Sequence, residues 1–337
     1  PLLRQYKYLL LSGGLVLTAL TLLMGTNPGG GSAPRLWLGC CGVYFQPSEP
    51  LKLLLVIYLS AYLADRKLSL ALSQTQGSTN RNSRLSLLSL LAPTVFMTGL
   101  VLLILFVQRD LGTVCIFLLL YALIVYVATR RAEILMANVA LLAIAGWVGY
   151  HYFDVVRLRV DAWLNPWLDP SGRSYQIVQS LLAIANGGLV GRGPGMGNPT
   201  LVPISHSDSI FAAIAEENGL VGVVALLILL ALMVNRGLHV AIRVNDYFQH
   251  YLAFGLTVYS VIQSVLIIGG NIRLLPLTGV TLPFISYGGT SLLTAWLALL
   301  FLLHISDHKE AGPLLKLSIQ PLLHVNLFLM GALASIA

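Results

Sequence analysis

The fold class is decided by the stretch Asp208-Ser-Ile-Phe-Ala-Ala-Ile-Ala-Glu-Glu-Asn-Gly-Leu-Val-Gly222, in which a polar, glycine-rich loop passes into a long apolar segment. The apolar segment, 209–234, is long enough to cross the roughly 30 Å hydrocarbon layer of a membrane. Asp208 lies immediately before this apolar segment, and Glu216 and Glu217 lie within it. Because an ionised carboxylate loses hydration at the edge of a bilayer, Asp208 is expected there only with polar partners or with a function.

The composition extends this interpretation to the whole chain. Hydrophobic residues make up 57% of the sequence and charged residues 10%, well outside the averages for soluble domains. The sequence therefore predicts an all-α, polytopic transmembrane helix bundle with one large extracellular loop. The 50–64 segment is short, so its span is expected to begin near Val43, and 314–337 is a further candidate. The predicted spans are 8–25, 50–64, 86–107, 111–129, 132–153, 209–234, 248–269 and 283–304.

The distribution of cations predicts the orientation of these spans. If each span crosses once, the basic residues near the span ends fall on one side, which the positive-inside rule makes cytoplasmic. The loops at 26–42, 154–207 and 270–282 and the corner at 108–110 then lie outside, and Asp208 faces outward from a bacterial cytoplasmic membrane. The cations on the cytoplasmic side are Arg4, Lys7, Arg66, Lys67, Arg81, Arg84, Arg130, Arg131, Arg236, Arg243, Lys309 and Lys316.

The outward loops also carry arginines that the positive-inside rule does not place there. Guanidinium groups match phosphate oxygens through two parallel hydrogen bonds, so this set suits an anionic ligand. The alternative is that individual arginines only reach toward lipid headgroups or solvate their loops. Nucleic acid is not expected, because the cations are spread over short loops. The outward arginines are Arg35, Arg109, Arg157, Arg159, Arg173, Arg192 and Arg273.

Four polar clusters lie at the outer ends of the spans. In Phe45-Gln-Pro-Ser-Glu-Pro-Leu-Lys52, Glu49 and Lys52 would share a helix face, either as a local ion pair beside a helix cap or as part of an anion site. In Gln108-Arg-Asp-Leu-Gly-Thr113, Asp110 could cap the next helix with Arg109 neutralising it, or the cluster could be part of a functional site.

The other two clusters are richer in glycine. The long outer loop contains Asn165-Pro-Trp-Leu-Asp-Pro170, then Tyr175-Gln176 and Gln179, then the glycines of 191–197, and its 175–186 part has amphipathic helical spacing. The last cluster, 269–291, breaks the helical pattern with two prolines and repeated glycines and includes Arg273 and Ser286. Such irregular backbone is tolerated at membrane depth where it lines a cavity, or it marks a kinked helix packed through small residues.

Together these motifs resemble the SEDS (shape, elongation, division and sporulation) family of RodA/FtsW-type peptidoglycan glycosyltransferases. The resemblance includes Phe-Gln-Pro-Ser-Glu, Gln-x-Asp-Leu-Gly-Thr, Asn-Pro-Trp-x-Asp-Pro, His-x-Asp and Ser-Tyr-Gly-Gly, in family order, and covers residues 1–308. It implies an enzyme that polymerises lipid II into glycan strands outside the cytoplasmic membrane, with release of undecaprenyl pyrophosphate. The family's essential acid falls on Asp208, the proposed general base for the acceptor hydroxyl.

The resemblance also implies positions for the substrate and for partners. Lipid II, the nascent glycan strand, membrane lipids and a class B penicillin-binding protein (transpeptidase) are the expected partners, and no cofactor is certain, although a divalent cation (Mg or Mn) would suit the leaving pyrophosphate. Glu216 and Glu217 are expected to be structural acids. The predicted substrate-binding residues are Gln46, Glu49, Lys52, Arg109, Asp110, Thr113, Gln176, Gln179, Arg273 and Ser286.

The sequence departs from the family at three places. Two amino-terminal family spans are expected to be missing, since the first segment aligns with the family's third. Tyr44 stands where many relatives carry a basic residue, and Arg273 is the candidate replacement cation. The 309–337 extension is expected to be an extra span or the start of a fused domain. Two other functions remain open, a lipid II flippase and a noncatalytic scaffold, although no matched pair of broken helices in two symmetric halves supports a transporter.

Overall fold

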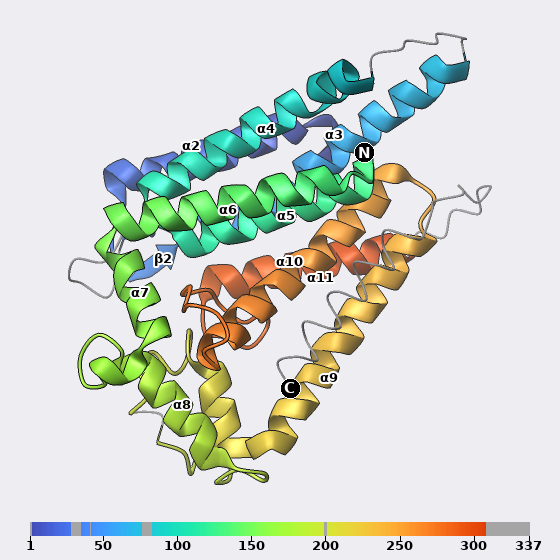
Figure 1. The fold of residues 1–337 in the computed structure, drawn as a ribbon. Coiled ribbons are helices and arrows are strands. Elements are labelled where there is room, and N and C mark those ends of the chain that lie inside the picture. Colours follow the sequence, from blue (N-terminus) through green and yellow to red (C-terminus); the bar gives the residue numbers. More distant parts are fainter. Residues whose placement is uncertain (1, 28–34, 41, 76–82, 199–200, 308–337) are drawn as a thin grey trace.

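The structure, a computed structural model, describes residues 2–27, 35–40, 42–75, 83–198 and 201–307. It is a helical bundle with one short hairpin, which confirms the predicted all-α class (Figure 1). Strands β1 (Leu38–Cys40) and β2 (Val43–Phe45) pair antiparallel. The helices are α1 (Leu2–Gln5), α2 (Lys7–Met24), α3 (Ser48–Thr75), α4 (Ser83–Val107), α5 (Leu111–Thr129), α6 (Ala132–Tyr152), α7 (Asp154–Leu164), the 3-10 helix η1 (Pro166–Leu168), α8 (Tyr175–Gly187), α9 (Ile210–Arg243), α10 (Tyr247–Asn271) and α11 (Gly289–Asp307).

Six helices in the described part of the chain, α2, α5, α6, α9, α10 and α11, are long and apolar enough to cross a membrane. The predicted spans at 50–64 and 86–107 also form long helices, α3 and α4, which lie beside them in the bundle (Figure 1). The chain is therefore a multi-pass membrane protein. The predicted span at 314–337 lies outside the described residues.

The start of the second span differs from the prediction. Val43 was expected near its beginning, but it belongs to β2, and the helix begins only at Ser48. The physical reason is Pro47, which disfavours helical backbone at the residue before it and suits a helix start. The last span is also shorter than expected, because 283–288 forms turns and α11 begins at Gly289.

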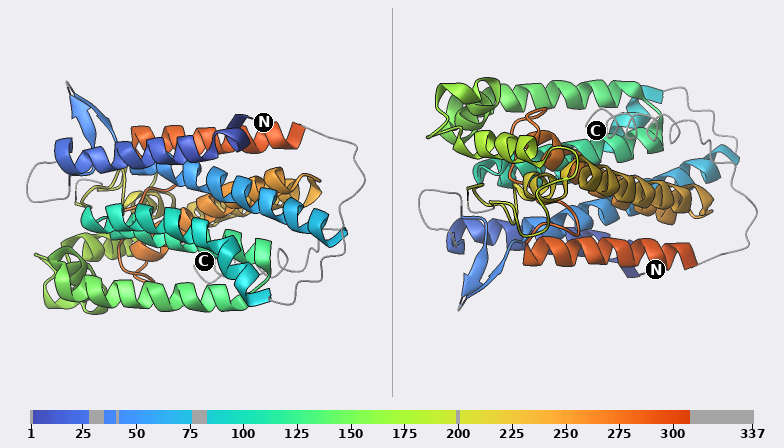
Figure 2. Two further views of the ribbon diagram at one scale, coloured as in Figure 1. Left: turned by 90° about the horizontal axis from the view of Figure 1, so that it is seen from above. Right: turned by 90° about the horizontal axis from the view of Figure 1, so that it is seen from below.

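Helix α10 is the centre of the bundle. Within its most apolar window 94% of the residues are buried, against 11% in α6. Helices α3, α5, α9 and α11 pack around α10. Figure 2 shows α6 at one edge of the bundle, with α2 and α11 at the opposite edge. Since α10 ends at Asn271, the most buried of the six candidate spans leads directly into the polar 269–291 cluster.

The β1–β2 hairpin and the longer described connections of the bundle lie at one end, which we call the loop end (Figure 1). It comprises the β1–β2 hairpin, α7, η1, α8 and the segments 188–198, 201–209 and 272–288. At the other end, Arg4 and Lys7 pair with Asp65 of α3, and Arg130 and Arg243 close α5 and α9. The predicted separation of cations from the long outer loop is therefore present for these residues.

Helix α9 bends sharply near its start (Figure 1) because Gly219 has non-helical backbone angles, φ 63° and ψ −163°. A side chain there would clash, since a Cβ would lie 2.3 Å from the backbone nitrogen of Gly191. The backbone amides of Arg192 and Gly193 donate to the carbonyls of Glu216 and Glu217 across this break. The glycine-rich loop thus satisfies backbone groups that the bend releases from the helix.

Glu216 supports the same bend with its side chain. It is 3% exposed, and one oxygen accepts a hydrogen bond from the backbone of Asn198 at 3.3 Å. The other lies 3.6 Å from the guanidinium of Arg192. These contacts fit the predicted role of Glu216 as a structural acid that pairs within the protein.

Candidate functional site

Asp208 lies at the loop end, held from two sides. The hydroxyl of Ser207 donates to its Oδ1 at 3.1 Å, and the side-chain amide of Asn271 donates to its backbone carbonyl at 2.8 Å. Asn271 is fully buried at the end of α10 and also donates to the carbonyl of Ile267 at 2.8 Å. The central helix of the bundle therefore fixes the backbone that carries the carboxylate.

The segment before Asp208 is fixed by the turn that precedes α11. The hydroxyl of Ser286 donates to the carbonyl of Ser207 at 2.9 Å and accepts from the amide of Leu282 at 2.8 Å. The amide of Tyr287 donates to the carbonyl of His206 at 2.8 Å. The His-x-Asp and Ser-Tyr-Gly-Gly motifs, distant in sequence, are thus one hydrogen-bonded unit, and Ser286 acts on its backbone.

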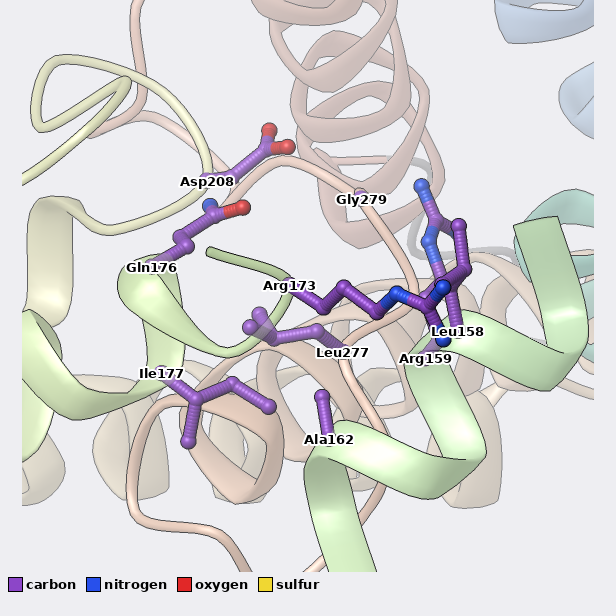
Figure 3. A pocket seen from close by; sticks show the side chains of 9 residues that line it. All are labelled: Leu158, Arg159, Ala162, Arg173, Gln176, Ile177, Asp208, Leu277 and Gly279. Carbon is purple, nitrogen blue, oxygen red and sulfur yellow. The ribbon is translucent and has the colours of Figure 1, made fainter. Parts of the chain in front are cut away.

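A small pocket of ≈ 80 Å³ opens beside Asp208 (Figure 3). Its polar lining comprises Asp208, Gln176 of α8, Arg159 of α7 and Arg173 of the loop before α8. Gln176 is held by a 3.2 Å bond from its amide to the hydroxyl of Ser209. The two guanidinium groups come from the side of the pocket opposite Asp208 and Gln176. The apolar lining is formed by Leu158, Ala162, Ile177 and Leu277.

Gly279 separates the acid from one of these arginines. Its φ is +71°, and an added Cβ would lie 3.2 Å from Nη2 of Arg159 and 3.5 Å from Oδ2 of Asp208. Arg159 is oriented by a 3.0 Å hydrogen bond from Nη1 to the carbonyl of Thr278. A carboxylate and a guanidinium therefore converge on one small space, which only a residue without a side chain leaves open.

The electrostatics of Asp208 follow from this environment. Burial raises the pKa of its carboxyl above the ordinary aspartate value, and this is the largest effect. The hydrogen bond from Ser207 and the charges of Arg159 and His206 lower the pKa, without cancelling the effect of burial. A carboxylate with a raised pKa is a better proton acceptor than an ordinary surface aspartate.

Asp208 is the one acid among the nine residues that line the pocket. No group of three or more His, Cys, Asp or Glu side chains in the described ranges is arranged to hold a metal ion. A metal centre built from protein side chains alone does not fit this site. Its positive charges are those of Arg159 and Arg173.

Two of the predicted site residues, Asp208 and Gln176, line the pocket. The others lie elsewhere in the loop end or deeper in the bundle. Asp110 caps α5 by accepting a 3.1 Å bond from the amide of Thr113, the simpler alternative for that cluster. Gln46 donates to the hydroxyl of Ser48 at 3.1 Å, and Gln179 is half-buried on α8.

The two arginines predicted as substrate contacts are not in the pocket lining. Arg109 is exposed, and its guanidinium lies 5.8 Å from the ring centre of Phe153. Arg273 donates to the carbonyls of Trp163 and Leu164 at 2.8 and 2.7 Å, so its guanidinium closes the end of α7. Their roles as substrate contacts stay predictions.

Arg159, Arg173 and Gly279 were not selected from the sequence as site residues. The two arginines belonged to the outward set, but nothing in their local spacing separated them from Arg157 or Arg192. Gly279 lay within a glycine-rich cluster. No signal in the sequence selects Arg159, because Arg157 lies on the same helix and the segment was expected to belong to a loop.

Glu49 and Lys52 form the predicted pair on one face of α3. Nζ of Lys52 donates to Oε1 of Glu49 at 2.7 Å. Lys52 is 0% exposed and Glu49 is 5% exposed. The ammonium also lies 5.9 Å from the ring centre of Tyr259 in α10. The pair therefore links α3 to the central helix.

We expect Lys52→Met to destabilise the protein by about 3–5 kcal/mol, because it leaves a buried carboxylate without its countercharge. Thermal unfolding of the detergent-purified protein, followed by tryptophan fluorescence, measures this. The double variant Glu49→Gln/Lys52→Met removes both charges and should recover most of the loss. A single variant as stable as the unmodified protein would show that the ion pair contributes nothing to the fold.

Comparison with known proteins connects these features to a family. The family model described as "Cell cycle protein" (FtsW, RodA, SpoVE) matches residues 2–311. The chain is 38% identical over 314 residues to peptidoglycan glycosyltransferase RodA of Mycobacterium tuberculosis, covering 93% of this chain and 66% of that protein, just under two thirds of its length. It is 33% identical over 317 residues to probable peptidoglycan glycosyltransferase FtsW of Geobacter metallireducens, covering 92% and 79%.

The fold is likewise similar to a solved structure. A chain in a peptidoglycan synthase complex, described as coordinating polymerization and crosslinking, superposes with a TM-score of 0.70 at 28% identity. The match covers 91% of this chain and 83% of that one. The similarity therefore includes the bundle together with its loop end.

Proposed function

The chain belongs to the SEDS family of FtsW, RodA and SpoVE proteins, and from this premise we propose that it is a peptidoglycan glycosyltransferase that polymerises lipid II. The observation that carries the proposal is the convergence of the Asp208 carboxylate and the Arg159 guanidinium across Gly279. Glycosyl transfer from a lipid diphosphate needs a base beside the acceptor hydroxyl and a cation beside the leaving group. The pocket offers both within one space.

In the proposed reaction, the acceptor sugar's hydroxyl oxygen attacks the anomeric carbon of the donor. The new glycosidic C–O bond forms as the C–O bond to the diphosphate breaks, and the bonding electrons leave with undecaprenyl pyrophosphate. Asp208 takes the hydroxyl proton. One base suffices for such an inverting displacement, because the acceptor hydroxyl stands where an inverting hydrolase activates water.

Arg159 and Arg173 are assigned to the diphosphate. Arg159 is already oriented by Thr278, so its guanidinium is pre-organised to receive an anion without losing side-chain freedom. The side chain of Arg173 reaches toward the side of the pocket where Arg159 lies, and Arg173 is exposed. Together they offset charge that develops on the leaving oxygen. A divalent cation would be held by Asp208 and would supply positive charge to the leaving diphosphate.

Asp208 is proposed to face outward from the cytoplasmic membrane. The support is the separation of the loop end from Arg4, Arg130 and Arg243 at the opposite end of the bundle. A class B penicillin-binding protein is the proposed partner. The support for a partner is the similarity to the synthase complex.

The pH dependence of polymerisation tests the role of Asp208. Only the ionised carboxylate accepts a proton, so kcat/KM should fall as pH falls through the Asp208 pKa. Because burial raises that pKa, the fall should begin at a higher pH than for an ordinary aspartate. Ser207→Ala removes a hydrogen bond that lowers the pKa and should move the fall to still higher pH. Initial rates with fluorescent lipid II measure this, and a fall that moves to lower pH in Ser207→Ala would contradict the assignment.

The deciding experiment for the activity combines two assays on the purified full chain, with and without its transpeptidase partner. With fluorescent lipid II in detergent, polymer ladders on a gel are expected. In vesicles, lipid II translocation is followed in parallel. Ladders that depend on Asp208 support the polymerase. Translocation without any polymer would instead support a flippase. If the protein showed neither activity, a noncatalytic scaffold would be the remaining function.

A further inference from the structure

A second hollow adjoins the Asp208 pocket, and no role described above uses it. We call it the α7–η1 hollow, because it lies between the end of α7, η1 and the start of α8. It shares Ala162 and Arg173 with the Asp208 pocket. Its volume, ≈ 340 Å³, exceeds the ≈ 80 Å³ of that pocket. A ligand that reacts at Asp208 therefore has a larger contiguous space beyond Arg173.

The lining of the hollow mixes hydrogen-bonding groups with apolar surface. Asp161 and Asp169 offer acceptors, and Asn165 offers both a donor and an acceptor. Leu164 and Leu168 contribute exposed apolar walls, 55% and 82% exposed. Sugars present the matching chemistry, because their hydroxyl and acetamido groups both donate and accept while their ring faces are apolar.

Ser174 adds a hydroxyl to the polar lining of the hollow. It lines the hollow, is 3% exposed and stands at the N-cap of α8, yet its side chain makes no capping hydrogen bond. Among the residues that the structure describes, none forms a hydrogen bond with its hydroxyl. The hydroxyl can therefore donate to and accept from a group that binds in the hollow.

The charged residues that line the hollow disfavour binding of the substrate's diphosphate there. Two carboxylates, Asp161 and Asp169, face one guanidinium, that of Arg173. The Asp208 pocket has the opposite balance, with Arg159 and Arg173 against one acid. An anionic leaving group is therefore attracted to the Asp208 pocket, and an uncharged part of the same substrate fits the hollow.

The walls of the hollow are held in place. The hydroxyl of Tyr150 donates to Oδ1 of Asp161 at 3.0 Å, and the amide of Arg173 donates to Oδ2 of Asp169 at 3.0 Å. Arg273 bonds the carbonyls of Trp163 and Leu164, and the indole of Trp163 returns a 3.1 Å bond to the carbonyl of Arg273. This clamp fixes the end of α7, directly before Asn165. Arg273 is thus a positioning residue for the hollow.

We propose that the α7–η1 hollow is a saccharide subsite that binds the N-acetylhexosamine units next to the bond formed at Asp208. The proposal rests on the proposed glycosyl transfer and states where the sugar units of the substrate bind. Asn165 and Ser174 bind the sugar's polar groups, Leu164 and Leu168 contact its ring faces, and Arg173 marks the boundary with the diphosphate.

The test uses the purified full chain and a neutral probe, the disaccharide N,N′-diacetylchitobiose, with binding measured by saturation-transfer NMR. Asn165→Ala and Ser174→Ala should each weaken binding about tenfold, the effect of one lost hydrogen bond. Asp208→Asn should bind the probe like the unmodified protein. Asn198→Ala is the matched control, since Asn198 is exposed in the outer loop and lines neither cavity.

A second probe, inorganic pyrophosphate, tests whether the diphosphate binds in the Asp208 pocket and not in the α7–η1 hollow. Its binding should be lost in Arg159→Ala and kept in Asn165→Ala. In the polymerisation assay, Asn165→Ala should raise the KM for lipid II with a smaller change in kcat. A chain that binds the disaccharide but makes no polymer would refute the proposed activity and keep the subsite. No disaccharide binding by the unmodified protein, or equal binding by both hollow variants, would overturn the subsite.

Discussion

Replacing Asp208 with asparagine is expected to lower polymerisation of lipid II by about 10²–10⁴-fold, the usual contribution of a general base. Asparagine keeps the size of the side chain and an oxygen that can accept from Ser207. The backbone carbonyl at this position still accepts from Asn271. The substitution therefore removes proton acceptance while leaving the loop's hydrogen bonds in place, and the loss should appear in kcat.

The measurement is the initial rate of polymer formation from fluorescent lipid II, with thermal unfolding recorded on the same samples. Glu217→Gln is the matched control, because it makes the same chemical change nearby in α9 and does not line the pocket. It should polymerise like the unmodified protein. Asp208→Asn with an undiminished rate and a normal unfolding temperature would remove Asp208 as the base.

Replacing Arg159 with glutamine is expected to lower kcat by about 10²–10³-fold, comparable to the loss of one pre-organised group that stabilises transition-state charge. Glutamine can still donate a hydrogen bond toward Thr278, but it carries no charge for the diphosphate. Arg159→Lys should recover only part of the rate. An ammonium lacks the planar fork that bonds Thr278 and an anion at the same time.

Arg157 supplies the control on the same helix. Its guanidinium donates to the carbonyls of Tyr150 and His151 at 3.3 and 3.2 Å and is exposed, away from the pocket. Arg157→Gln should therefore keep the polymerisation rate. Equal losses in both variants would indicate that α7 needs its charge only for stability or for lipid contact, and the diphosphate assignment would fail.

Two of the predicted polar clusters show what spacing along the sequence could predict. Glu49 and Lys52 are three residues apart, so helix geometry alone placed them on one face. Asp110 precedes an apolar run, and the cap that it forms was one of the two alternatives considered for it. Both predictions depend on neighbours within one turn of the chain, where sequence spacing and spatial distance agree.

The arginines show what spacing along the sequence could not predict. Arg159 bonds Thr278, 119 residues away, and Arg273 bonds Trp163, 110 residues away. Seven outward arginines looked equivalent in the sequence. Only the packing of α7 against the 272–288 segment assigned one to the pocket and another to the helix end.

The sequence by itself determined that the chain spans a membrane, which segments contain its membrane-spanning helices, that polar loops gather at one end and that Asp208 is the acid to suspect. It did not predict α7, which lies in the segment expected to belong to the outer loop. Each of these follows from hydropathy, helical period and motif order, which are properties of neighbouring residues. The tertiary structure alone decided that Arg159 faces Asp208 across Gly279, that Arg273 closes α7 and that a second hollow adjoins the pocket. The physical reason is that a hydrogen bond or an electric field acts through space, and only the folded backbone brings residues more than one hundred positions apart to within 3 Å.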